Sequence, residues 1–151
     1  MNFVQKTHIV IHHSLTKDGS VVDYEAIRRY HMETNGWKEI GYHVILEQVG
    51  GNVLAIMGRL PNEIGAHCRE MHMNVYGIGI CLVGNFDAAP PSDSIWKKAQ
   101  QVVRYFQSLY QIPSHCVVGH REAQIMDPTV GRALKTCPGL LFDMNQFRAG
   151  L

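Results

Sequence analysis

Short apolar runs recur along the chain and predict the strands of a β-sheet. Runs of about four to eight residues that are rich in Val and Ile and bounded by turn residues are typical of buried strands. The predicted strands cover about residues 7–12, 42–46, 53–55, 77–83 and 116–118. Gly50, Gly51 and Asn52 separate the second run from the third and predict a β-hairpin there.

Apolar residues at helical spacing predict a long helix over about residues 95–110. Ser92 or Ser94 can cap its N-terminus, and Pro113 ends it. The stripe that we expect to face the core consists of Ile95, Ala99, Val102, Val103, Phe106, Leu109 and Tyr110. A long loop is expected over about residues 121–140, followed by a short helix over about 142–147.

A further helix is predicted over about residues 24–34, with Asp23 as its cap and Asn35-Gly36 as its end. The residues expected on one face of this helix are Ile27, Tyr30, His31 and Thr34. Asp18-Gly19 predicts a turn before it. Residues 57–76 contain Gly, Pro and His and predict a loop-rich segment.

The order of these elements predicts the fold class. Strand, helix, strand, strand, strand, helix and strand follow one another, which favours an α/β fold with a central mixed β-sheet flanked by α-helices. A length of 151 residues suits one domain with a core of its own. We therefore expect a single domain over residues 1–151.

Composition and charge exclude several function classes. A net charge of +1 without a basic run predicts no nucleic-acid partner. No apolar stretch approaches the roughly 18 residues of a membrane span, so no membrane insertion is expected. The N-terminal residues lack the charged and apolar regions of a signal peptide, which predicts a protein made in the cytoplasm and not exported by the general pathway.

The cysteines are Cys68, Cys81, Cys116 and Cys137. An even number permits two disulfides in a secreted protein, but without an export signal we expect free thiols or a metal ligand. Cys81 lies within an apolar run and is expected to be a small core residue, and Cys116 is expected to be structural.

Three residues from the two ends of the chain form a candidate metal site: His12, His120 and Cys137. Both histidines follow apolar runs, at strand ends where loops and sites gather. Two imidazoles and one thiolate suit zinc and leave one coordination position open, as in catalytic zinc sites. His13 is the alternative to His12, because side chains alternate along a strand. The Cys-x-x-Cys and His-Glu-x-x-His patterns are absent.

Several short blocks, in this order and spacing, carry a family resemblance. They are Ile9-Val10-Ile11-His12-His13-Ser14, Gly36-Trp37-Lys38-Glu39-Ile40-Gly41-Tyr42-His43, Gly65-Ala66-His67, Asn74, Ile78-Gly79-Ile80-Cys81-Leu82-Val83-Gly84-Asn85-Phe86, Gly119-His120-Arg121-Glu122 and Lys135-Thr136-Cys137-Pro138-Gly139 with Phe142-Asp143. The chain resembles the zinc-dependent N-acetylmuramoyl-L-alanine amidases, which include T7-type phage lysozymes and the peptidoglycan recognition proteins.

The resemblance implies the family's mixed sheet and a role for each matching residue. His12, His120 and Cys137 would hold Zn²⁺, Tyr42 and Lys135 would be catalytic, and His67 and Asn74 would line the substrate groove. The implied substrate is peptidoglycan or a muropeptide, cut at the amide between N-acetylmuramic acid and L-alanine. A monomer is expected. The general base stays open, and Glu122 beside His120 is either a candidate or a structural residue.

The resemblance leaves alternatives in other classes. They are a peptidoglycan-binding module without activity, a cytoplasmic amidase that recycles anhydromuropeptides, and a purely structural zinc site. Because the chain is short and lacks a signal peptide and an added wall-binding domain, we favour a phage or prophage endolysin. Such an enzyme would reach the cell wall in the periplasm after release by a separate membrane-permeabilising protein.

Overall fold

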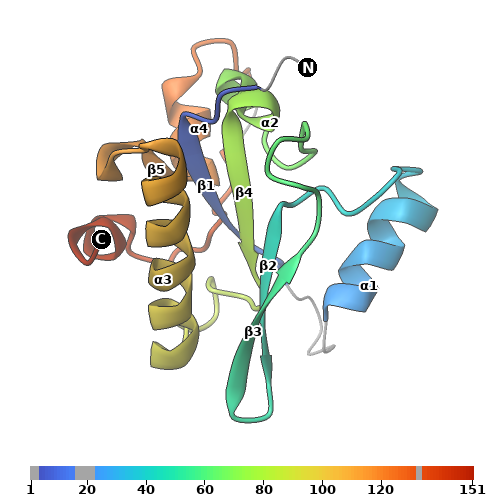
Figure 1. Cartoon of the computed structure of the whole chain (residues 1–151), viewed down its shortest axis with the longest axis vertical. Coiled ribbons are helices and arrows are strands. Elements are labelled where there is room, and N and C mark those ends of the chain that lie inside the picture. Colours follow the sequence, from blue (N-terminus) through green and yellow to red (C-terminus); the bar gives the residue numbers. More distant parts are fainter. Residues whose placement is uncertain (1–3, 16–22, 132–133) are drawn as a thin grey trace.

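The computed structural model describes residues 4–15, 23–131 and 134–151. The turn expected at Asp18-Gly19 lies outside these residues. Within them, five strands form one sheet in the order β3-β2-β4-β1-β5 (Figure 1). The strands are β1 (His8–His13), β2 (Val44–Val49), β3 (Asn52–Met57), β4 (Gly77–Leu82) and β5 (Val117–Gly119). β1 runs parallel to β4 and β5, and β2 runs parallel to β4 and antiparallel to β3, so the predicted mixed sheet is confirmed.

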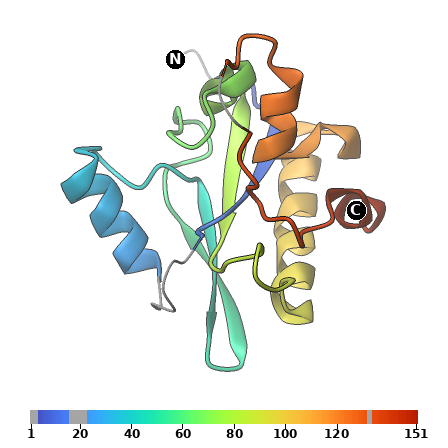
Figure 2. The same cartoon turned by 180° about the vertical axis from the view of Figure 1, so that it is seen from behind.

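Helices cover both faces of the sheet (Figures 1 and 2). One face packs against α3 (Asp93–Tyr110) and α5 (Met144–Ala149) and forms the larger core. The other face carries α1 (Tyr24–Arg29), α2 (Met73–Tyr76) and α4 (His120–Met126) over two smaller clusters. The remaining helical turns are η1 (Tyr30–Thr34), η2 (Glu70–His72) and η3 (Ser114–Cys116). In the described part of the chain, no helix is both long and apolar enough to cross a lipid bilayer.

β4 shows why the two faces differ. Side chains alternate along a strand, and Ile78, Ile80 and Leu82 all enter the larger core. Gly79 and Cys81 therefore point to the opposite face, where small side chains leave space above the middle of the sheet. The strand is buried along its whole length, so that space is filled by side chains from other elements.

The predicted caps are confirmed, but one helix face is not. The Asp23 side chain accepts a hydrogen bond of 2.8 Å from the amide of Ala26 and begins α1. Ile27 is buried as predicted, whereas Tyr30 and Thr34 are exposed. Thr34 lies at the end of η1, a wider π-helical turn in which the amide of Asn35 bonds to Tyr30. A π-helical turn contains more residues than an α-helical one and shifts the register of the face.

The long helix α3 follows its predicted stripe except at Leu109. Its cap is Ser92, whose hydroxyl accepts a hydrogen bond of 3.3 Å from the amide of Ile95. Leu109 is exposed, contrary to the prediction. Leu109 lies two helical turns after Val102, on the same side of the helix. Val102 is itself only partly buried, so this side is the margin of the stripe, and Leu109 is exposed to solvent there.

The prediction of a loop over residues 121–140 is wrong for its first part, because α4 begins at His120. Glu122 caps this helix by accepting a hydrogen bond of 2.8 Å from the amide of Gly119. Ala123 is buried, but the larger apolar residues Ile125 and Met126 are exposed. The helix therefore lacks the apolar stripe that would have predicted it. The loop-rich segment 57–76 likewise ends in the short turns η2 and α2.

Lys6, in the segment before β1, forms hydrogen bonds with the segment that leads into β4. Its side chain is buried, with the residue 1% exposed. The ammonium donates hydrogen bonds to the carbonyl oxygens of Glu63 at 3.1 Å, Val75 at 2.8 Å and Gly77 at 3.4 Å. A buried ammonium is tolerated only where such acceptors replace water, so this lysine holds together parts of the chain that are far apart in sequence.

Replacing Lys6 by Met should lower the free energy of unfolding by about 1–3 kcal/mol, because buried carbonyls lose their donor. Chemical denaturation measures this change. Lys38→Met is the matched control, since the Lys38 side chain is 71% exposed and forms a surface ion pair of 3.3 Å with Glu63. The control should change stability by less than about 0.5 kcal/mol. Equal effects of the two variants would contradict the assigned role of Lys6.

Candidate active site

A cavity of about 480 Å³ lies on the face of the sheet that carries α1, α2 and α4. The carboxyl end of β1 contributes to it, as do the segments before β2 and around residues 66–67 and 135–137. The lining residues are His12, His13, Leu15, His31, Trp37, Tyr42, Ala66, His67, His120, Lys135, Thr136 and Cys137. Most of the residues singled out in the sequence therefore border one space.

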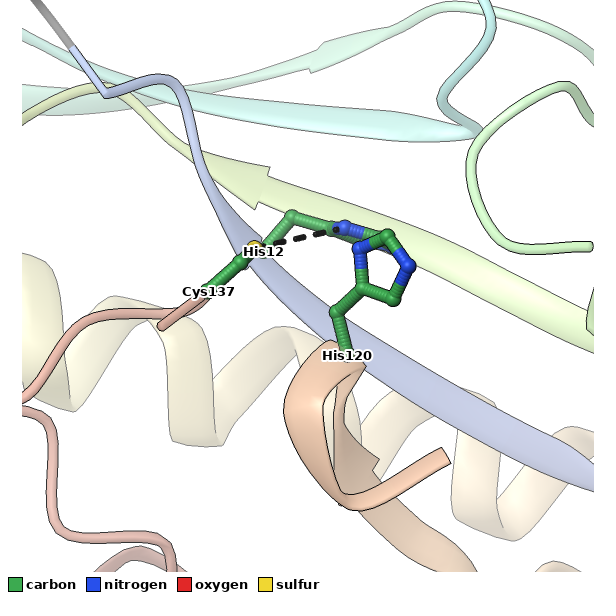
Figure 3. Close-up of side chains that lie close together, drawn as sticks. All are labelled: His12, His120 and Cys137. Carbon is green, nitrogen blue, oxygen red and sulfur yellow. Dashed lines mark hydrogen bonds between the residues drawn. The ribbon is translucent and has the colours of Figure 1, made fainter. Parts of the chain in front are cut away.

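His12, His120 and Cys137 point toward one another in this cavity (Figure 3). One ligand atom from each lies within 4.8 Å of the others. The Cys137 sulfur is 3.6 Å from Nδ1 of His12, and the rings of His12 and His120 are 4.8 Å apart between centroids. β1, the first residue of α4 and the loop after α4 supply the three side chains. This arrangement can hold one metal ion.

Both histidine rings are oriented by a second contact. Nε2 of His12 lies 3.0 Å from Nδ1 of His67, so Nδ1 of His12 is the nitrogen that faces Cys137. Nε2 of His120 lies 3.1 Å from a carboxylate oxygen of Glu70. A hydrogen bond to one ring nitrogen fixes which nitrogen can bind a metal. Both rings are thereby held in defined orientations.

The protonation states of the cluster suit a metal ion. Burial, together with nearby His120 and His67, lowers the pKa of His12 well below its usual value and keeps the ring neutral. Burial raises the pKa of the Cys137 thiol to about 12. A thiol of this kind becomes a thiolate at neutral pH only when a cation binds its sulfur. Two neutral imidazoles and one such thiol fit zinc by the chemistry of their donor atoms.

Arg121 shapes the turn that carries Cys137. Its amide donates a hydrogen bond of 2.8 Å to the carbonyl of Cys137 itself. Its guanidinium donates to the carbonyl oxygens of Thr136, Gly139 and Phe142. Sequence reasoning did not single out Arg121 as a site residue. The sequence marks Arg121 only by its position next to His120. In the structure, that position brings Arg121 to the turn that carries Cys137.

His13 has a different environment from His12. Its Nδ1 accepts a hydrogen bond of 3.1 Å from the amide of Phe86, and its ring packs against the ring of Phe86. His13 borders the cavity but does not belong to the cluster of ligand atoms. The geometry therefore favours His12 over its neighbour as the metal ligand.

Tyr42 and Lys135 lie on the cavity wall in different settings. The Tyr42 ring is 5.2 Å from the His12 ring between centroids. Burial and the neighbouring thiols raise the pKa of Tyr42 well above its usual value, so its hydroxyl stays protonated and can donate a hydrogen bond. The Lys135 side chain is exposed, while its amide donates a hydrogen bond of 2.6 Å to Gln124.

Asn74 and Glu122 lie outside the cavity lining. The Asn74 side chain accepts hydrogen bonds from the amides of His67 at 2.7 Å and Cys68 at 2.8 Å, so it shapes the loop that presents His67. Glu122 caps α4 and pairs with Arg148 at 2.8 Å and 2.9 Å. Its carboxylate is thus engaged in structural contacts away from the cluster.

Comparison with known proteins identifies the family. A sequence profile described as N-acetylmuramoyl-L-alanine amidase matches residues 3–140. The chain belongs to this amidase family. The endolysin of Enterobacteria phage T3 is 32% identical over 139 residues, covering 92% of this chain and 83% of the endolysin.

Two further relatives extend the comparison. The N-acetylmuramoyl-L-alanine amidase of the pig, Sus scrofa, is 29% identical over 147 residues, which cover 90% of this chain but 22% of the pig protein. The chain therefore spans about a fifth of the length of that relative. The solved structure of bumblebee PGRP-SA superposes with a TM-score of 0.73 at 27% identity, covering 98% of this chain and 83% of PGRP-SA. The predicted family and fold are confirmed.

In this amidase-family chain, Gly79 of β4 makes room for His67. A Cβ atom at residue 79 would lie 2.5 Å from Cγ of the His67 ring and 2.7 Å from its Nδ1, the atom that contacts His12. The alternation of large and small residues along β4 thus determines where the His12 ring can be held. Gly65 approaches His67 as closely, with a Cβ distance of 2.5 Å to Cδ2.

We expect Gly79→Ala to displace His67 and lower the free energy of unfolding by about 1–3 kcal/mol, the usual cost of overpacking. Zinc binding should weaken as well, because His12 loses its fixed partner. Urea denaturation and zinc competition titration measure the two effects. Gly51→Ala in the hairpin is the matched control, since nothing lies within 4 Å of a Cβ there. Identical behaviour of the two variants would show that His67 does not depend on Gly79.

Proposed function

We propose that the protein is a zinc-dependent N-acetylmuramoyl-L-alanine amidase that hydrolyses the amide between N-acetylmuramic acid and L-alanine in peptidoglycan. The carrying observation is the convergence of His12, His120 and Cys137 in one cavity with Tyr42 on its wall, in a chain of the amidase family. The similarity to the phage T3 endolysin supports a role as an endolysin.

In this proposal, His12, His120 and Cys137 hold the metal ion. When bound, zinc supplies Lewis acidity, which makes water a better nucleophile at neutral pH and polarises the amide carbonyl. His12 and His120 each have a second contact that prevents rotation of the ring, so the donor atoms are in place before the ion arrives. Arg121 contributes by holding the Cys137 turn.

Tyr42 and Lys135 act on the substrate in this proposal. The protonated Tyr42 hydroxyl can donate a hydrogen bond to the oxygen that becomes negative as the amide carbonyl is attacked. The exposed Lys135 ammonium can place a positive charge near the same oxygen from the cavity mouth. His67 would orient His12 in addition to bordering the substrate.

Two observations favour hydrolysis over a binding or a structural role. Cys137, Tyr42 and Lys135 all border the cavity, whereas a module that only binds would not need the three together. Structural zinc sites are closed by four protein ligands, but among the described residues this cluster offers three and opens into the cavity. A catalytic zinc site requires such an open coordination position for water or substrate.

The proposed setting is the bacterial cell wall. The chain matches 83% of the length of the T3 endolysin, so the similarity includes most of that protein. We infer that the protein acts as a monomer on the wall after release from the cell that makes it. A recycling amidase would use the same chemistry on soluble anhydromuropeptides. Comparing turnover of intact sacculi with turnover of soluble fragments separates the two roles, and faster cleavage of sacculi is expected.

The purified protein should release peptides with a new L-alanine amino terminus from peptidoglycan, as detected by mass spectrometry. A chelator should stop the reaction and zinc should restore it. Cys137→Ser and His120→Ala should each lower activity by more than about 100-fold, since even outer contacts of metal ligands cost up to that much. Cys116→Ser, which changes a thiol outside the cluster, is the control and should retain activity. Full activity in Cys137→Ser would refute the metal assignment.

Tyr42→Phe should reduce kcat by about 100- to 1000-fold, the usual cost of removing one donor to a developing oxyanion. Lys135→Met should have an effect in the same direction through the loss of the positive charge. Steady-state kinetics on peptidoglycan fragments measures both. Tyr105→Phe and Lys97→Met remove the same groups from exposed positions on α3 and serve as controls. Normal turnover in Tyr42→Phe would remove that residue from the catalytic set.

A further inference from the structure

A second, buried group of polar side chains lies behind His120, and its other members, Cys68, Glu70 and Gln124, are outside the cavity lining. Glu70 and His120 form its centre, with a distance of 3.1 Å between Oε2 and Nε2 and side-chain exposures of 1% and 6%. The Cys68 thiol lies 3.4 Å from the same carboxylate oxygen. Gln124 of α4 donates from Nε2 to Oε1 of Glu70 at 3.4 Å. The carboxylate therefore has partners on both oxygens without direct access to the cavity.

Gln124 connects this group to the catalytic loop. Its Oε1 accepts the 2.6 Å hydrogen bond from the amide of Lys135, while its Nε2 faces Glu70. An amide side chain has one accepting and one donating end. Reversing it would place the donating end against the Lys135 amide and the accepting end against the Glu70 carboxylate. The two contacts together therefore fix the orientation of Gln124 and link Glu70 to the position of Lys135.

The backbone next to Glu70 is held in an uncommon conformation. Met71 and His72 both have left-handed dihedral angles, with φ of 51° and 56°. Such angles cost free energy in residues other than glycine and persist only where the surroundings enforce them. Here the amide of Met71 donates a hydrogen bond of 2.9 Å to the Asp127 carboxylate at the end of α4. The strained turn thus anchors η2 against α4, where Glu70 meets His120.

We propose that Glu70 is a positioning residue that fixes the ring of His120 for metal binding, and that Gln124 extends the same network to Lys135. The proposal rests on the proposed function for the presence of the metal. A buried carboxylate that accepts a hydrogen bond from a metal-binding histidine fixes the ring and increases the electron density on its other nitrogen. One network then aligns a metal ligand and the loop that carries the catalytic lysine.

Glu70 could instead be a ligand of a second metal ion. Ligand atoms of Cys68, Glu70 and His120 also lie within 4.8 Å of one another and could hold a second ion. The hydrogen bonds favour positioning instead, because the Cys68 thiol donates to Glu70 and the carboxylate also contacts His120 and Gln124. The number of zinc ions bound per chain distinguishes the two assignments, and one ion is expected.

The first experiment compares zinc affinity in wild type, Glu70→Gln and the control Glu25→Gln, which changes an exposed carboxylate on α1. Competition with a chromophoric chelator gives the dissociation constant, and circular dichroism verifies folding without metal. Glu70→Gln should bind zinc about 10- to 100-fold more weakly, while Glu25→Gln should match wild type. Glu70→Asp, which withdraws the carboxylate by one methylene, provides the comparison if the Gln variant does not fold.

The second experiment tests the link to Lys135. Gln124→Met keeps the length of the side chain but removes both hydrogen bonds, so kcat should fall by about 10-fold with a small change in KM. Zinc affinity should change less than in Glu70→Gln. Gln101→Met on the exposed side of α3 is the control. A merely structural role of Gln124 would lower thermal stability without changing kcat of the folded protein, which would overturn this part of the proposal.

The outcomes separate this proposal from the proposed function. Wild-type zinc affinity in a folded Glu70→Gln variant would overturn the positioning role while leaving the amidase assignment intact. Two zinc ions per wild-type chain would make Glu70 a ligand and would overturn it as well. A wild-type protein that binds zinc but leaves peptidoglycan uncut would refute the proposed function, and the affinity comparison would still decide the role of Glu70.

Discussion

The alternation of side chains between the two faces of the central strands is the constraint on which the rest of the structure depends. β4 sends Ile78, Ile80 and Leu82 into the larger core, so its Gly79 and Cys81 must face the other way. The same alternation in β1 directs Ile9 and Ile11 into that core and leaves His12 on the opposite face, level with Cys81 of β4. Burial on one side thus leaves space on the other and places His12, the first proposed metal ligand, in that space.

The site above that face is built in two layers. The inner layer brings His12, His120 and Cys137 within reach of one ion. The outer layer holds each of them, since His67 contacts His12, Glu70 contacts His120 and Arg121 holds the cysteine turn. The sheet, α4, η2 and the loops all contribute. A cluster of proposed metal ligands made from such distant segments requires the whole domain to be folded.

Local signals in the sequence predicted most of the elements because the relevant forces act over short distances. The Val- and Ile-rich runs predicted the strands, and Asp23 and Ser92 cap their helices. α4 was missed because Ile125 and Met126 face solvent, so no apolar stripe marks it. The face of the first helix was predicted in part, since a π-helical turn cannot be recognised from α-helical periodicity.

The sequence by itself determined the strands, the long helix and, through its resemblance to the amidases, the residues expected to bind metal and act on substrate. Only the tertiary structure decided how these residues are supported. Glu70 and Gln124 lie 54 positions apart, and Glu70 and His120 lie 50 apart. No local pattern encodes such contacts, because they arise when the packing of η2 and α4 brings the side chains together.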